Sequence, residues 1–144
     1  MTPPRRILLA TDFSEAADCA LAYARAMVSP LDAKLHLLHV IPDPYSLPWL
    51  LHTGAADIRH LIDTWKAQAQ QRLEALRPDE TTLIATTVGR PSLEIVRYAK
   101  THEIDLIVMG LHGHGTVSDV LIGSVADKVV RTAPCAVLTV RTPD

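Results

Sequence analysis

Four glycines are spaced along residues 110–124, which read GLHGHGTVSDVLIGS and end in a serine. Gly110 ends an apolar run, and Gly123 with Ser124 precedes a helical pattern, so the stretch connects a strand to a helix. Glycine adopts positive φ angles, and its missing β-carbon lets a ligand approach the main chain. The first turn of a helix attracts phosphate through unpaired N–H groups and a partial positive charge. The stretch is therefore predicted to bind phosphate, with Ser124 capping the helix; a tight connection without a ligand is the alternative.

Apolar runs and helical patterns alternate along the chain that carries this stretch. Nearly continuous apolar runs, typical of strands covered on both faces, lie at residues 5–11, 34–41, 82–88, 105–110 and 135–140. Helical apolar stripes lie at residues 14–28, 58–76, 93–99 and 124–131. This order predicts a doubly wound α/β fold: a five-stranded parallel sheet, Rossmann-like with strand order 3-2-1-4-5, with helices on both faces. Ligands of such sheets bind beyond the carboxyl ends of the strands.

Composition and length narrow the classes of protein. We expect residues 1–144 to form one domain, because 144 residues lie in the usual range for a single core. No apolar run is long enough to span a bilayer, and the N-terminus lacks the pattern of a secretory signal, so a cytoplasmic protein without a membrane partner is expected. A net charge of -2 and 4% aromatic residues argue against nucleic-acid binding. Cys19 and Cys135 lack metal-ligand spacing and are interpreted as small hydrophobes.

The spacing of the glycines resembles a known signature. Gly110, two residues, Gly113, nine residues, then Gly123 and Ser124 is similar to the nucleotide-binding signature of the universal stress protein family. The segments ILLATDFSE, LHLLHVI, GRPSLEIVRYAKTHEIDLIVMG and GSVADKVVRTAPCAVLTVR resemble that family too, so the likeness covers the whole chain. It implies an ATP-binding, stress-response regulatory protein with little or no catalysis. It also implies a homodimer joined through the last strand, residues 135–141, and an unknown regulatory protein partner.

The resemblance further implies which residues contact an adenine nucleotide. Asp12 matches an acidic residue near the ribose and adenine, although a helix cap in a capping box with Glu15 is an alternative role. Val40 matches a residue whose backbone meets the adenine, and strand packing is its alternative role. The complete predicted set is Ala10, Thr11, Asp12, Val40, Met109, Gly110, His112, Gly113, His114, Gly115, Gly123, Ser124 and Val125.

Two positions of the loop depart from the family's pattern. Where many relatives have arginine or lysine, this chain has His114 and, further along, Asp119. A neutral histidine neutralises less phosphate charge than arginine, and an aspartate repels a triphosphate. The expected cofactor is therefore ATP, or else ADP or AMP, with Mg²⁺ bridged by Asp119 or Asp12 as one alternative. If His114 serves the phosphates, ATP affinity increases as the pH falls through the histidine range.

Three classes of function stay open at this point. The first is a nucleotide-binding regulatory module, and the second is a slow ATPase in which Asp12 positions water and hydrolysis drives a switch. The third is a dimeric interaction module without a bound nucleotide. The pairs His36 with His39 and His112 with His114 have no third ligand at a zinc-like spacing, so they are interpreted as solvated strand-end and loop histidines.

Overall fold

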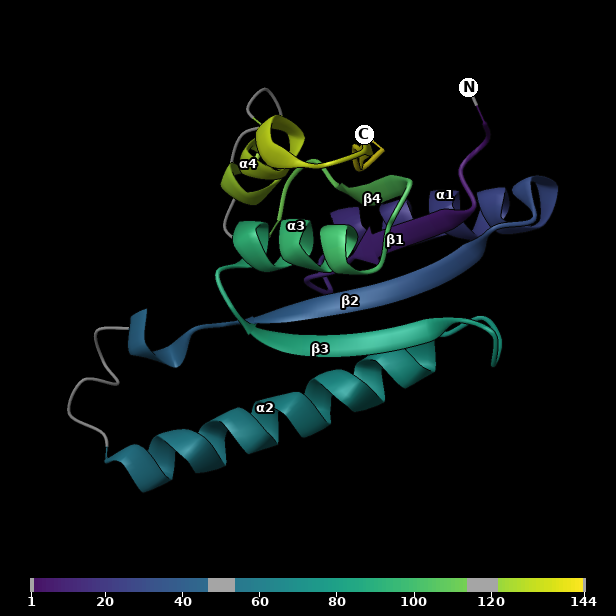
Figure 1. Ribbon diagram of the computed structural model, residues 1–144. Helices are drawn as coiled ribbons and strands as arrows, with labels where there is room; N and C mark the ends of the chain where they lie inside the picture. Colours follow the sequence, from purple (N-terminus) through teal and green to yellow (C-terminus); the bar gives the residue numbers. More distant parts are fainter. Residues whose placement is uncertain (1, 47–53, 114–121, 144) are drawn as a thin grey trace.

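The sheet of the molecule has five parallel strands. The computed structural model describes residues 2–46, 54–113 and 122–143. The strands are β1 (Arg6–Ala10), β2 (Lys34–Pro42), β3 (Leu83–Gly89), β4 (Leu106–Gly110) and β5 (Ala136–Val140). They lie in the order β3-β2-β1-β4-β5, as the colours in Figure 1 allow the reader to follow. The predicted doubly wound fold and its strand order are confirmed.

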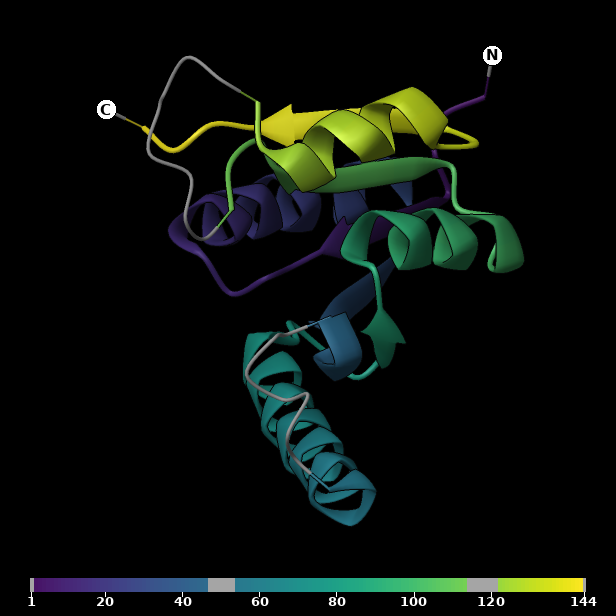
Figure 2. The ribbon, with the colours of Figure 1, turned by 90° about the vertical axis from the view of Figure 1, so that its left-hand side faces the viewer.

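Four helices cover the two faces of this sheet. They are α1 (Glu15–Leu31), α2 (Ala55–Leu76), α3 (Pro91–Thr101) and α4 (Ser124–Thr132), and a short 3₁₀ helix, η1 (Pro44–Ser46), follows β2. Side chains alternate between the faces of a strand, so Ile7 and Leu9 pack with α1 and α2, whereas Leu8 and Ala10 pack with α3 and α4. Figure 2 shows α1 on one side of the sheet and α3 with α4 on the other. Across the described residues, every helix is too short or too polar to cross a bilayer.

The end of α1 differs from the prediction. The sequence predicts a helix over 14–28, whereas α1 continues to Leu31. The helix ends in a Schellman motif, in which the Ala33 N–H donates to the Val28 carbonyl at 2.9 Å and Asp32 adopts a left-handed φ of 49°. Glycine usually takes that left-handed position. Because an aspartate takes it here, no glycine marks the end of α1 in the sequence.

The strand register brings the sequence-distant candidate residues together. Ala10, at the end of β1, lies opposite Leu38 of β2 and Met109 of β4. Because the three strands are parallel, the residues that follow these positions all leave the sheet at one edge. Asp12 therefore lies close to the glycine-bearing connection from β4 to α4.

Candidate functional site

A cavity of about 400 Å³ lies at the carboxyl ends of β1, β2 and β4, and the first residues of α3 and α4 close it. Every residue of the predicted set that the structure describes lines this cavity: Ala10, Thr11, Asp12, Val40, Met109, Gly110, His112, Gly113, Gly123, Ser124 and Val125. His114, Gly115 and Asp119 lie outside the described residues. The structure thus brings the set together, while its contacts with a ligand stay a prediction.

One wall of the cavity is apolar and was not anticipated. It consists of Leu38 and Pro42 from β2 and of Pro91 and Ile95 from α3. Leu38 could have been inferred from the two-residue period of the strand, because it shares a face with Val40. The two residues of α3 could not, because only the packing of α3 against β2 brings them to this edge. Such a wall suits the face of a planar ring.

The structural reason for glycine at position 110 differs from the predicted one. We predicted that the loop glycines supply positive φ angles, but among the described glycines only Gly89 has one, at 156°. At Gly110, a β-carbon would lie 2.8 Å from the Ala16 Cβ on α1. This glycine is therefore needed for the close approach of the sheet to a helix.

Gly113 and Gly123 make the cradle of the cavity. A β-carbon at Gly113 would lie 2.5 Å from Oδ2 of Asp12, and one at Gly123 would lie 3.0 Å from the Leu111 carbonyl oxygen. The Gly123 N–H donates to that carbonyl at 2.8 Å, so both ends of the connection from β4 to α4 meet at its base. The absence of side chains here leaves main-chain groups and the Asp12 carboxylate accessible from the cavity.

The start of α4 supplies donors to the same space. Gly123 is the N-cap, and no side chain in the described ranges caps the helix, so the predicted capping role of Ser124 is wrong. Ser124 is already the first helical residue, because the first bond of the helix runs from the Asp127 N–H to the Gly123 carbonyl at 2.9 Å. The preceding N–H groups of Ser124, Val125 and Ala126 have no partner within the helix. All three residues line the cavity, which therefore faces a helix end of positive potential.

Asp12 is fixed by a turn instead of capping α1. Its Oδ1 accepts the Ser14 N–H at 2.9 Å, and the Ser14 hydroxyl accepts the Ala17 N–H at 3.2 Å as the true cap. The alternative role of Asp12 in a capping box with Glu15 is therefore wrong. The reason is the left-handed backbone of Phe13, φ 64°, which separates Asp12 from the first turn. The half-buried carboxylate is thereby oriented along the cavity.

Of the two histidines of β2, His36 is buried and His39 is half-buried, so their interpretation as solvated residues is wrong. Nδ1 of His39 lies 2.8 Å from the Thr11 carbonyl oxygen, which only accepts, so Nδ1 carries a proton. Burial lowers the pKa of His39, which favours the neutral ring. Nδ1 of the buried His36 lies 2.8 Å from the Tyr98 hydroxyl.

His112 lines the cavity and has unsatisfied polar atoms. Both of its ring nitrogens are buried, and neither has a hydrogen-bond partner among the residues that the structure describes. Buried polar atoms normally have partners, so these two nitrogens favour a ligand or water at this place. Searching the described ranges finds no group of three His, Cys, Asp or Glu side chains that could hold a metal ion. The cavity therefore combines an apolar wall, main-chain donors, one carboxylate and one unpaired imidazole.

Comparison with known proteins gives a consistent result. The model of the universal stress protein family matches residues 3–141. A universal stress protein of Thermus aquaticus is 36% identical over 140 residues, which cover 95% of this chain and 98% of that protein. The structure of the protein MJ0577 of Methanocaldococcus jannaschii has a TM-score of 0.85 at 28% identity, with 97% of each chain covered. A universal stress protein in complex with cAMP, 24% identical, shares the fold with a TM-score of 0.67 over 99% of this chain and 100% of that one.

Proposed function

This chain belongs to the universal stress protein family, and we propose that it is a cytoplasmic stress-response regulator that binds an adenine nucleotide with little or no hydrolysis. The observation that carries the proposal is the cradle of Gly113 and Gly123 at the start of α4, where main-chain donors line a cavity of about 400 Å³. Such donors at a helix N-terminus favour phosphate. The structure of a universal stress protein with cAMP supports the same class of ligand for this fold.

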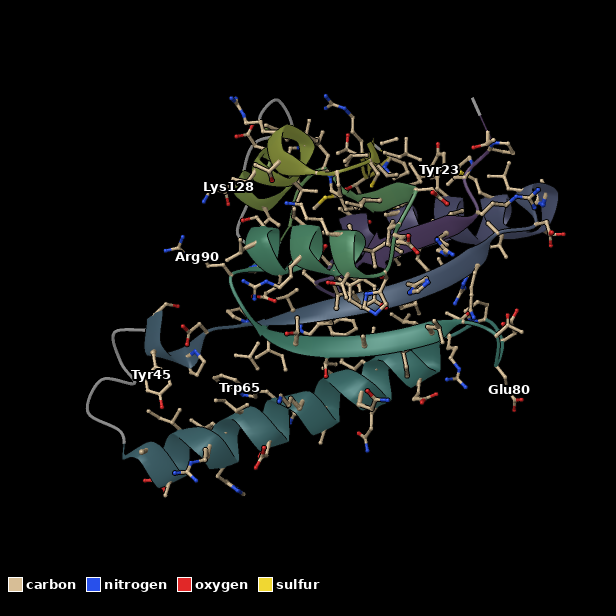
Figure 3. All side chains as sticks on the ribbon, in the orientation of Figure 1. Tyr23, Tyr45, Trp65, Glu80, Arg90 and Lys128 are labelled. Carbon is tan, nitrogen blue, oxygen red and sulfur yellow. The ribbon has the colours of Figure 1, made fainter. Side chains whose placement is uncertain are left out.

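Each part of the cavity has a role in this proposal. The adenine lies against the apolar wall of Leu38, Pro42, Pro91 and Ile95, near the backbone of Val40. Asp12 accepts a hydrogen bond from a ribose hydroxyl. The N–H groups at the start of α4, together with the glycine backbone and the Ser124 hydroxyl, donate to the phosphates. Figure 3 shows Arg90 and Lys128 projecting at this end of the molecule, where they add positive potential around the opening.

The charged residues of the cavity bear on how many phosphates its ligand carries. The cavity holds Asp12 and no arginine or lysine among its described lining residues, so it provides little compensation for a triphosphate. The family resemblance makes ATP the first ligand to test, and this lack of positive charge makes ADP and AMP its competitors. If Mg²⁺ accompanies the nucleotide, phosphate oxygens and water would supply most of its ligands, with Asp12 or Asp119 as the bridging carboxylate.

The proposal is tested by mass spectrometry of the nucleotide that survives purification, followed by calorimetry with ATP, ADP and AMP. Bound ATP without released phosphate is the expected result. Released phosphate would select the slow ATPase with Asp12 positioning the water. No binding of any of the three nucleotides would contradict nucleotide binding altogether and leave a dimeric interaction module.

Variants of the glycines test the cradle. We expect Gly123→Val to weaken nucleotide binding at least about tenfold, because its side chain meets the Leu111 carbonyl, a backbone atom that cannot move aside. Gly113→Ala should act in the same direction by displacing the Asp12 carboxylate. Gly54→Ala is the matched control, because the nearest atom to its β-carbon lies 3.7 Å away, on Asp57. Unchanged affinity in both cradle variants, measured by calorimetry, would remove the cradle from the site.

We also propose that two copies form a homodimer through the C-terminal strand, residues 135–141, and that the dimer acts on a regulatory protein partner. The strand order supports this, because β5 is the last strand of the sheet and pairs only with β4 among the described strands. An edge strand offers unpaired backbone groups that a second copy can use.

A further inference from the structure

A second cavity, which we name the α2 groove, lies between α2 and the carboxyl ends of β1 and β2. Its volume is about 610 Å³. It is lined by Asp12, Phe13, His39, Ile41, Pro42, Trp65, Gln68, Ala69, Gln71 and Arg72. Asp12, His39 and Pro42 also line the nucleotide cavity, so the two spaces adjoin. The proposed nucleotide function uses none of the α2 side chains in this groove.

Arg72 is held in the groove by a ring. Its guanidinium carbon lies 4.0 Å from the centroid of the Phe13 ring. The His39 ring also contacts Phe13, with the two ring centroids 4.6 Å apart. Phe13 is bulky and keeps a left-handed φ of 64°, a strained conformation that is found mostly at functional sites. The cation–π contact orients the guanidinium before any ligand arrives.

The guanidinium of Arg72 has no carboxylate partner in the described part of the chain. Five other arginines of that part do form ion pairs with carboxylates: Arg5, Arg6, Arg77, Arg97 and Arg131. A guanidinium presents a planar fork of donors that matches the two oxygens of a carboxylate. Asp12 lines the same groove, so a ligand with one negative charge is favoured over a phosphate dianion.

Trp65 supplies the surface for a ring. Figure 3 shows this side chain on the side of α2 that faces the sheet, and it is half-buried in the wall of the groove. The amide side chains of Gln68 and Gln71 line the groove on the same helix and offer both donors and acceptors. A large aromatic side chain beside an oriented cation matches a planar ring that carries an acid group.

We propose that the α2 groove binds a planar aromatic monocarboxylate, with its ring against Trp65 and its carboxylate on Arg72. This ligand is distinct from the nucleotide and does not require it. Because Asp12 and His39 line both spaces, occupancy of one site changes the affinity of the other, and by linkage the effect is reciprocal.

Fluorescence of Trp65 tests the proposal with a named probe. The chain has two tryptophans, so Trp49→Phe leaves Trp65 as the single reporter. We expect saturable quenching by 4-nitrobenzoate, and binding at least tenfold weaker for the neutral isostere 4-nitrobenzamide. Arg72→Gln should reduce the affinity for 4-nitrobenzoate to that for the amide, whereas Arg59→Gln, exposed on the same helix and outside the groove, should leave it unchanged. Calorimetry of the unmodified chain with the acid and the amide repeats the comparison without any substitution.

Three results would overturn the inference. They are quenching that does not saturate, equal affinity for the acid and the amide, and displacement of 4-nitrobenzoate by AMP in full competition, which would place the probe in the nucleotide cavity. Titration with AMP alone is measured in parallel, so failure of nucleotide binding is recognised separately from failure of the α2 groove.

Discussion

Burial of one side chain, His36, makes the stability of the molecule depend on pH. Burial lowers the pKa of His36 from 6.5 to about 4, and the nearby charges of His102, Lys34 and Arg6 act in the same direction. His36 is 4% exposed, and its Nδ1 is bonded to the Tyr98 hydroxyl. The folded state therefore holds this ring neutral at a pH where an unfolded chain would protonate it.

The free energy of unfolding should fall as the pH is lowered from 6.5 to 4. Over this window the unfolded chain binds a proton at His36 that the folded chain does not, so acid favours unfolding. A difference of roughly 2.5 pKa units corresponds to about 3 kcal/mol, since one unit is about 1.4 kcal/mol. Urea denaturation of the protein and of His36→Gln across this pH range checks the effect. The variant should show the shallower dependence, although His39 still contributes with the same sign; equal slopes for both proteins would contradict the assignment to His36.

The residues that line the cavity were predicted better than their geometry. The glycines and Asp12 were identified because their residue types and their positions after strands can be read directly from the sequence. Their structural roles were not, because they depend on contacts across the chain, such as the approach of a Gly113 β-carbon position to Oδ2 of Asp12 at 2.5 Å. The buried, unpaired nitrogens of His112 also result from packing, which no local pattern indicates.

At the scale of elements, α3 ends in the same way as α1. The Ile104 N–H donates to the Ala99 carbonyl at 2.9 Å, and Glu103 adopts a left-handed φ of 51°. This is again a Schellman motif without glycine. A residue with a β-carbon pays a conformational cost at such a position, and glutamate has no local hydrogen bond that offsets it as asparagine does.

Glu103→Gly should therefore raise the free energy of unfolding by about 0.5–1 kcal/mol. The ion pair of Glu103 with Arg6 that would be lost is exposed to solvent and contributes little. Glu103→Gln is the matched control, because it also loses the charge but keeps the β-carbon, and its stability should remain near that of the original chain. Thermal or urea unfolding measures both, and a glycine variant that is less stable than the glutamine variant would refute the explanation.

The existence and order of the elements could be predicted, whereas their ends could not. The alternation of apolar runs with helical stripes is a local property, and it is sufficient to predict the strands and the four helices. The last turn of α1 depends on Asp32 taking a left-handed conformation that aspartate tolerates but that its presence does not predict. The coverage of the cavity at the ends of β1, β2 and β4 by Pro91 and Ile95 depends on how α3 packs on the sheet, which is a property of the tertiary structure.

At the scale of the whole molecule, the direction of the backbone groups of β5 defines the proposed dimer. The Val140 carbonyl accepts the Leu111 N–H at 2.8 Å, so Val140 directs its backbone toward β4. Because successive residues of a strand point in opposite directions, Thr139 and Val137 direct their N–H and carbonyl groups outward. These outward groups are the ones that a second copy would use.

Proline at position 139 should separate the copies without unfolding them. Thr139→Pro removes an outward N–H and leaves the bonds of β5 to β4 intact, which an edge strand tolerates. Thr139→Val keeps the N–H and serves as the control. Size-exclusion chromatography with light scattering should find a dimer for the original chain and Thr139→Val, and a monomer for Thr139→Pro. An original chain that is monomeric at micromolar concentration would exclude the proposed dimer.

The hydrogen bond from the Gly123 N–H to the Leu111 carbonyl affects which changes of sequence the connection from β4 to α4 tolerates. It joins the two ends of this connection, so insertions or deletions between residues 114 and 121 need not shift the strand or the helix. The cradle of Gly113 and Gly123 and the residues between its two ends can then be altered independently. A graft of foreign residues between positions 114 and 121 should consequently leave the scaffold with its fold.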